Sequence, residues 1–385
     1  MSKLRVVTWM VSLLMMGVLL VGCGQQPAVE PTMVRLPTTT PTTAIPTPTL
    51  TPTPTSTPLP PASTPTPTPT SLPPSPSPRP QPPTATPTPG LQGRFVFQVA
   101  SGGDIYTVNT DGSNLTRLTD GMDPSWSPDG RQITFSRWRS PWGIYTINAD
   151  GSDERLLLSS NVARTPIWSP DGSQIAFYFE TEGWTAPLKA CIEGYGCIVV
   201  IPPQLQTEWH LGVVDVADGY LHQPYNDRFS FSPSWSADGE WIVYDGGDHG
   251  SLHGLSVTTV EGPNNQVLTE NVHDHFPVWS PDGALIAFMH WQHDHWEIYV
   301  MNASGGGRGA LTSSSALLER RPNNVSPAWS PDGGQIVFLS DRGGKWEFYV
   351  MNADGSNQRK ILEGVTERLN IQYDGVNERV ISWAR

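Results

Sequence analysis

The stretch Trp126-Ser127-Pro128-Asp129-Gly130, followed by the alternating run Ile133-Thr134-Phe135, decides the fold of this chain. Ser-Pro-Asp-Gly places proline at the second and glycine at the fourth position of a type I turn, which reverses one strand into the next. Apolar residues of the β-branched and aromatic kind at every second position are typical of a strand packed between two layers. We therefore expect a strand that ends at Trp126, a tight turn and a second, buried strand.

This unit recurs along the chain, with spacings of 42, 67, 44 and 50 residues between successive tryptophans. The later copies begin at Trp168, Trp235, Trp279 and Trp329. Each copy continues into a third strand such as Ile144-Tyr145, a hairpin such as Asn148 to Gly151, and a short fourth strand. Four strands per unit and a period in the forties predict an all-β propeller of four-stranded antiparallel blades. The count favours six blades, with seven as the alternative, and the strands of 95–118 should complete the blade opened by 371–384.

The WSPDG-x-x-I-x-F core with its trailing I-Y…N-x-D-G-S resembles the WD-repeat-like propeller repeat of TolB, which prolyl-oligopeptidase-type peptidases also carry. The resemblance covers residues 91–385 and implies a TolB-like β-propeller. The sequence departs from the repeat at Ala237 in place of Pro, at Tyr373 in place of the last Trp, and at Gly305 in place of the hairpin Asp. TolB also has an N-terminal α/β domain where this chain has a Pro/Thr-rich stretch, so a Tol–Pal role does not follow. No G-x-S-x-G motif occurs, so we expect no peptidase activity.

The N-terminus has the pattern of an export signal. A short basic start and an uncharged apolar run from Val6 to Val21 predict a signal peptide over residues 1–22. Leu20-Val21-Gly22-Cys23 resembles the bacterial lipobox, which implies lipidation of Cys23 and a membrane anchor on the exported side. An uncleaved signal anchor is the alternative. Residues 27–89 hold 23 of the 39 prolines, so residues 23–90 should form a disordered, extended stalk below the propeller of 91–385.

Charge excludes one class of partner. Residues 91–385 carry 19 basic and 35 acidic side chains, a net charge of −16. Such a surface repels the phosphate backbone, so we expect no nucleic-acid binding.

Histidine is concentrated in one part of the chain, where seven of the nine lie between residues 249 and 295. Strand order places all seven on one face of the propeller, over two neighbouring blades. Imidazoles with nearby carboxylates are ligands for zinc or manganese, although a polar loop surface explains the same residues without a metal. The candidate ligands are His249, His253, His273, His275, His290, His293, His295, Asp274 and Asp294.

The remaining signals concern contacts outside the repeat. Cys191 and Cys197 lie in an insertion at about 180–208 and should form a disulfide in an oxidising exterior, with free thiols or a metal pair as the alternatives. The insertion is a candidate partner-contact surface. Tryptophans outside the repeat position could stack on sugars or anchor a protein. They are Trp138, Trp142, Trp184, Trp291 and Trp296.

Two functions fit these observations. The first is a surface-anchored, non-enzymatic lipoprotein whose propeller binds a protein or glycan. The second is a metal-dependent extracellular enzyme, such as a polysaccharide lyase, that uses the histidines. Turn-capping explains the repeated aspartates, so we expect none of them to be catalytic.

Overall fold

A computed structural model describes residues 91–385, except 161, 185–187, 193–195, 202–204, 225–228, 249–250, 262–263, 315–319 and 376–377. For 184, 188–192, 196–201, 247–248 and 251–253 it describes the backbone alone. The predicted signal peptide, Cys23 and the stalk therefore lie outside the described residues. Within the described part, no helix is long and apolar enough to cross a membrane.

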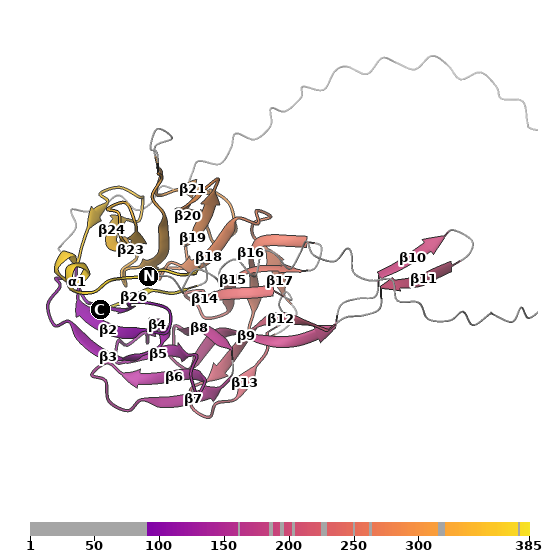
Figure 1. Cartoon of the computed structure of the whole chain (residues 1–385), viewed down its shortest axis with the longest axis horizontal. Helices are drawn as coiled ribbons and strands as arrows, with labels where there is room; N and C mark the ends of the chain where they lie inside the picture. The colour runs from indigo at the N-terminus through magenta and orange to yellow at the C-terminus, as the bar shows by residue number, and fades with distance from the viewer. Residues whose placement is uncertain are drawn as a thin grey trace, which may run out of the picture. The chain divides into compact units, whose positions relative to one another are not determined.

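The described chain is an all-β propeller whose sheets follow one another around an axis (Figure 1). Four of the sheets have four antiparallel strands each. The seam sheet runs in the order β26 (Ile381–Ala384), β1 (Arg94–Gln98), β2 (Asp104–Asn109) and β3 (Thr116–Asp120). The next is β4 (Met122–Trp126), β5 (Gln132–Arg137), β6 (Gly143–Asn148) and β7 (Arg155–Ser159). The third is β18 (Asp274–Trp279), β19 (Leu285–Gln292), β20 (His295–Asn302) and β21 (Gly309–Ala310). The fourth is β22 (Asn324–Trp329), β23 (Gln335–Ser340), β24 (Glu347–Asn352) and β25 (Arg359–Lys360).

Between the second and third of these lies an eight-stranded sheet made of two antiparallel runs. One run is β8 (Ala163–Trp168), β9 (Gln174–Trp184), β12 (Leu205–Asp215) and β13 (Leu221–His222). The other is β14 (Phe229–Trp235), β15 (Trp241–Asp248), β16 (Ser251–Thr259) and β17 (Asn265–Val267). A single parallel pair, Trp209 with Phe229, joins the two runs. The predicted insertion lengthens β9 and β12 and adds the separate hairpin of β10 (Leu188–Ile192) and β11 (Gly196–Ile201).

The Ser-Pro-Asp-Gly turns are built as the sequence predicts. In the first copy the Gly130 amide donates to the Ser127 carbonyl at 2.9 Å, and Gly130 has a positive φ of 67°. The Ser127 hydroxyl donates to Asp129 at 2.7 Å and accepts from the Gln132 amide at 2.9 Å. These bonds lower the pKa of Asp129, chiefly through the serine hydroxyl. The aspartate is therefore part of the turn, as expected.

The repeat tryptophans occupy the innermost strands, and four of them, Trp126, Trp168, Trp235 and Trp329, are each 6% exposed. The sixth copy was predicted wrongly: Trp383 on β26, and not Tyr373, holds this position and is 8% exposed. The Trp126 amide donates to the Ser382 hydroxyl at 3.2 Å, just as the Trp279 amide donates to Ser234 at 3.0 Å. Tyr373 lies before β26 and contacts Trp346 instead.

The seam closes as predicted. Among the described residues after β25, a short helix, α1 (Glu363–Arg368), is followed by one strand, β26. β26 pairs antiparallel with β1, from Arg94 opposite Ala384 to Phe97 opposite Ile381. β26 is therefore innermost, and β1 takes the second position.

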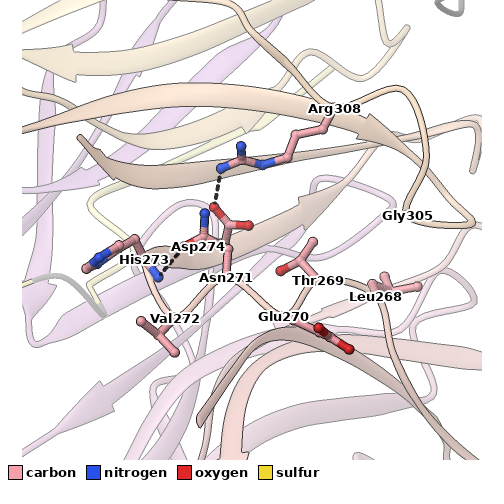
Figure 2. A pocket seen from close by; sticks show the side chains of 9 residues that line it. All are labelled: Leu268, Thr269, Glu270, Asn271, Val272, His273, Asp274, Gly305 and Arg308. Carbon is pink, nitrogen blue, oxygen red and sulfur yellow. Dashed lines mark hydrogen bonds and ion pairs between the residues drawn. The ribbon is translucent and has the colours of Figure 1, made fainter. Parts of the chain in front are cut away.

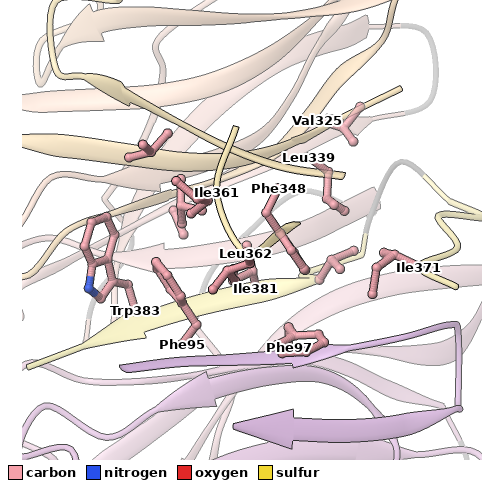
Figure 3. Close-up of a cluster of buried hydrophobic side chains, with 14 of the residues drawn as sticks. Phe95, Phe97, Val325, Leu339, Phe348, Ile361, Leu362, Ile371, Ile381 and Trp383 are labelled. Carbon is pink, nitrogen blue, oxygen red and sulfur yellow. The ribbon is translucent and has the colours of Figure 1, made fainter. Parts of the chain in front are cut away.

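Apolar side chains from both ends of the chain meet in one core cluster at the seam (Figure 3). The Phe95 and Trp383 rings lie 4.8 Å apart, and Phe97 meets Phe348 edge-on at 5.2 Å. Leu362, at the start of α1, packs in the same cluster. The seam is thus a packed interface as well as a strand pairing.

One hairpin also differs from its prediction. Gly305 has a φ of 86°, close to the 83° to 87° of Gly112, Gly151 and Gly355, so it occupies the glycine position and not the aspartate position. Ser304 is the residue that replaces Asp. The Asn302 side chain accepts the Ser304 amide at 3.1 Å and the Gly306 amide at 2.8 Å, and these bonds hold the turn.

Candidate functional site

The strand register gathers most of the predicted histidine cluster at one end of the β18–β21 sheet. Asp274 stands opposite His290, and Gln292 stands opposite His295. We call this end of the propeller, where the innermost strands begin, the histidine face. His249 lies outside the described residues, and for His253 only its backbone position on β16 is described.

Asp274 is the centre of the strongest polar cluster on this face. It begins β18 and is fully buried. Arg308 Nη2 donates to Asp274 Oδ1 at 2.6 Å, and His290 Nδ1 lies 2.8 Å from the same oxygen. The Arg308 guanidinium also lies over the Tyr299 ring at 4.6 Å, which fixes its direction. The ion pair is thus held from two sides by strand residues.

The second carboxylate oxygen of Asp274 has no such partner. Oδ2 is buried and makes no hydrogen bond to the described residues. Asp274 lines a hollow of about 670 Å³, together with His273, Arg308 and residues of the β17–β18 connection. Figure 2 shows Arg308 reaching toward the Asp274 carboxylate at the edge of this hollow. A buried acceptor without a donor costs free energy, so this oxygen is suited to a donor from a ligand.

The other histidines form separate pairs with carboxylates. His275 Nδ1 lies 2.7 Å from Asp245 Oδ2, which belongs to β15 of the neighbouring sheet. Burial works against the charged imidazole, but the Asp245 charge and hydrogen bond raise the pKa of His275 above its usual value. His275 therefore ties β18 to β15.

His295 is held between two carboxylates. Its Nδ1 lies 2.9 Å from Asp294 Oδ1 and its Nε2 lies 3.0 Å from Glu297 Oε1. His293 is exposed in the β19–β20 turn, where it has a positive φ of 61°. No group of three or more His, Cys, Asp or Glu side chains suited to a metal ion occurs within the part of the chain that the structure describes. The predicted metal site stays a prediction, because His249 and the His253 side chain lie outside that part.

The sequence analysis missed a second polar cluster, which lies at the start of the innermost strands near the axis. Arg164 on β8 lies 3.4 Å from Asp123 of β4 and 3.4 Å from Glu378 before β26. Burial and the Asp123 charge raise the pKa of Glu378. The side chain of Gln98 accepts the Asp123 amide at 2.5 Å. Three strands far apart in the sequence are thereby joined.

Arg379 sits at the centre of this cluster and is 5% exposed. Its guanidinium donates to the carbonyl of Pro166 at 2.9 Å and to that of Pro233 at 3.3 Å. Its amide donates to Asp123 at 2.9 Å. Burial lowers the pKa of Arg379 to about 10, which leaves it protonated at neutral pH. The spacing holds a signal, because Arg379 lies four residues before Trp383, as Arg164 lies before Trp168. That signal can be used only once β26 is known to pair with β1 and Trp383 to hold the repeat position.

Two of the five tryptophans predicted to lie in loops are exposed to solvent. Trp138 and Trp142 are 45% and 43% exposed, and the Trp138 ring lies 4.6 Å from the Arg164 guanidinium. Trp291 and Trp296 are partly buried against each other, with ring centroids 5.0 Å apart. The side chain of Trp184 is not among those described.

Comparison with known proteins identifies the fold. Residues 198–380 match the family model described as PD40, TolB beta propeller domain. The structure of TolB from Acinetobacter baumannii is similar, with a TM-score of 0.56 and 18% identity over 76% of this chain and 66% of that chain. The putative TolB from Agrobacterium tumefaciens gives 0.50 and 17%, over 70% of this chain and 87% of that chain. The chain thus spans just under two thirds of the first of these structures.

An enzyme shares the same fold. Kuenenia stuttgartiensis hydrazine synthase has a TM-score of 0.51 and 14% identity, over 76% of this chain and 47% of that chain. Comparison with curated proteins found no match. At such identities the likeness shows the fold alone, so function has to be argued from the residues.

Proposed function

We propose that this chain, which carries a TolB-like β-propeller, is a binding module whose histidine face receives a segment of a partner protein. One observation carries the proposal: the buried Asp274 Oδ2, without a partner among the described residues, in a hollow of about 670 Å³ beside Arg308. A rigid ring presents such a site with little ordering cost, which favours binding. Trp138 and Trp142 on the same end add the residue type that dominates protein interfaces.

Site-specific photo-crosslinking in cells that make the chain tests this proposal. A cross-linking residue at His273, exposed at the edge of the hollow, should capture a protein. The matched control is Arg131, which is exposed in the β4–β5 turn at the opposite end of another sheet. Asp274→Asn should weaken the capture at 273. Equal capture at 273 and 131, or capture that Asp274→Asn leaves unchanged, would count against the histidine face.

A glycan ligand is the second candidate, because the Asp274 and Arg308 side chains offer an acceptor beside a donor. A sugar hydroxyl can donate to a carboxylate and accept from a guanidinium at once. A glycan array separates the candidates: binding of defined glycans that Asp274→Asn abolishes would replace the protein ligand.

The metal-dependent enzyme is the remaining alternative. It needs the predicted zinc or manganese site, whereas His275, His290 and His295 each pair with a different carboxylate. Metal analysis of the purified full chain decides. One equivalent of zinc or manganese that is lost in a His249→Ala, His253→Ala variant would favour the enzyme.

We also propose that the chain is exported and anchored through lipidated Cys23, with residues 23–90 as a spacer. The lipobox-like Leu20-Val21-Gly22-Cys23 supports this. Cys23→Ala should release the protein from the membrane fraction and remove the lipid mass from its N-terminal peptide. Membrane retention of that variant would indicate an uncleaved signal anchor.

Two finer structural proposals complete the picture. The backbone register places Cys191 opposite Cys197, at a separation that antiparallel neighbours and disulfides share. Alkylation without reductant should leave both unmodified if they form a disulfide. We also count six blades, since the two antiparallel runs of the eight-stranded sheet meet at one parallel pair only. An experimental structure in which β12 and β14 pair along their length would overturn that count.

A further inference from the structure

The face opposite the histidines is formed by the Ser-Pro-Asp-Gly turns, which contact one another around the ring. A Cβ built on Gly239 would lie 3.7 Å from Pro170 of the preceding turn, and one built on Gly333 would lie 3.8 Å from Pro281. The proline of one turn therefore fills the space beside the glycine of the next. The third copy lacks this proline, and only the small Ala237 side chain stands beside Gly283.

A second departure from the repeat lies at the same place. The first residue of the second strand is Gln132, Gln174 or Gln335 in three other copies, and Gln174 bonds across to Asp215 at 2.8 Å. In the third copy this residue is Trp241, opposite Thr259. The third copy therefore has an indole and no proline ring where two neighbouring sheets pack against each other.

The next tryptophan, Trp279, bonds differently from Trp235 and Trp329. Trp235 and Trp329 donate their indole N–H to the preceding innermost strand, at Ile167 and Val278. Trp279 donates instead to Gly283 of its own turn at 3.1 Å. It is also partly buried, whereas the two others are 6% exposed.

The result is a pocket of about 590 Å³ with aromatic walls and an acidic rim. Trp241 and Trp279 line it, and Asp238 and Asp282 stand at its edge. Each aspartate holds its own turn through Oδ1, which accepts a serine hydroxyl and a backbone amide. The Ser236 hydroxyl and the Glu240 amide lower the pKa of Asp238, so the rim is negative at neutral pH.

We propose that this pocket binds an organic cation on an apolar stem, namely a lysine or arginine side chain of a partner polypeptide. Indole faces attract cations, and the aliphatic stem of a basic side chain covers apolar surface while its charge stays near water. The pocket volume lies in the range of ligand sites. Gln266 and Val267 of β17, the outermost strand of its sheet, also line the pocket, so an extended segment alongside β17 could place a side chain in it. The pocket adjoins the hollow beside Asp274, since Leu268 lines both, but its aromatic walls and acidic rim belong to the turns of the opposite face.

The test is calorimetry on the full chain with matched probes. N-acetyl-lysine-N′-methylamide should bind at least tenfold more tightly than N-acetyl-norleucine-N′-methylamide, which has the same stem without the charge. Pentylamine serves as the free cation. Equal binding of the norleucine probe, or binding of pentylamine with the lysine probe excluded, overturns the assignment to a basic side chain of a polypeptide.

Variants locate the site. Ala237→Pro restores the repeat residue and narrows the pocket beside Gly283, and Trp241→Gln restores the residue found in three other copies, so both should fold. Each should weaken the lysine probe at least tenfold. Asp332→Asn changes a turn aspartate of another blade and should leave binding unchanged. Unchanged binding in Ala237→Pro, or the same loss in Asp332→Asn, overturns the proposal.

Discussion

Removing the Trp383 side chain should open the ring at its seam. Trp383 is 8% exposed, packs against Phe95 at 4.8 Å and donates its indole N–H to the Gln92 carbonyl at 2.9 Å. These two contacts join β26 to β1 and to the residues just before β1. Trp383→Ala removes both and leaves a cavity between β26 and β1.

The loss can be estimated from these contacts. Truncation of a buried tryptophan to alanine costs about 3–5 kcal/mol in the free energy of unfolding. About 1 kcal/mol of this belongs to the hydrogen bond to Gln92. At about 2 °C per kcal/mol for a domain of this size, Tm should fall by about 6–10 °C.

Thermal and urea unfolding of the full chain measure this effect. Trp142→Ala is the matched control, because that side chain is 43% exposed and its loss should change stability by no more than about 0.5 kcal/mol. Tyr373→Phe should cost less than about 1 kcal/mol, since its hydroxyl meets only the Met289 sulfur at 3.8 Å. If Trp383→Ala cost no more than Trp142→Ala, the ring would not depend on this seam.

Three further predictions concern the axis and the turns. Arg379→Met should lower the free energy of unfolding by about 2–5 kcal/mol in urea, because two buried proline carbonyls lose their donor; wild-type stability would show that the axial contacts are dispensable. Asp171→Asn should reduce the fall of Tm at acid pH. The Ser169 hydroxyl holds the pKa of folded Asp171 below 3.8, so the stability that this carboxylate contributes is lost as pH falls through the folded pKa. An unchanged acid slope in a plot of Tm against pH would contradict this. Ala237→Pro should stabilise the chain by about 0.4–1 kcal/mol, because other copies hold proline in the same turn, and a lower Tm would mean that this turn differs from its repeats.

Much of the fold could be predicted because each copy of the repeat has the same turn hydrogen bonds and the same alternation of apolar residues. The Ser-Pro-Asp-Gly turn fixes a reversal through bonds among its own residues, as between Ser127 and Asp129 at 2.7 Å. Alternation then decides which side chains of the next strand are buried, and Ile133 and Phe135 are fully buried as expected. Such features depend on neighbours in sequence.

The sixth copy could not be predicted in this way, because its turn is divided between the two ends of the chain. Trp383 is followed by Ala384 and Arg385, so no Pro-Asp-Gly follows to mark it. Only the pairing of β26 with β1 identifies its position. The assignment of Gly305 failed for a simpler reason, since the run from 305 to 307 is all glycine and offers no unique alignment.

The histidine face shows the same division. Strand order predicted which residues share one end of the propeller, and Asp274 opposite His290 agrees with it. Partners from other sheets could not be predicted, because Asp245 is 30 residues from His275 and belongs to a neighbouring sheet. Likewise nothing in the sequence indicated that Arg308 would occupy one oxygen of Asp274 and leave the other without a described partner.

Departures from the repeat fall into two kinds, and the difference bears on function. Ile381 stands where other copies have proline, but it is fully buried and pairs with Phe97. Ser304 stands where other hairpins have aspartate, and the Asn302 side chain holds that turn. Both changes are compensated within the fold. The change at Ala237 is not, because it leaves a pocket of about 590 Å³.

Packing between blades constrains these turn positions alike, so a space that the fold does not fill needs another explanation. Pro170 and Pro281 take the corresponding position in the neighbouring turns. The pocket beside Ala237 is the space that we propose a ligand occupies. By the same reasoning, the buried Asp274 oxygen on the opposite face indicates a ligand of its own. The repeats of this ring are otherwise regular. Its two candidate sites lie where the fold leaves a space unfilled or a buried oxygen without a described partner.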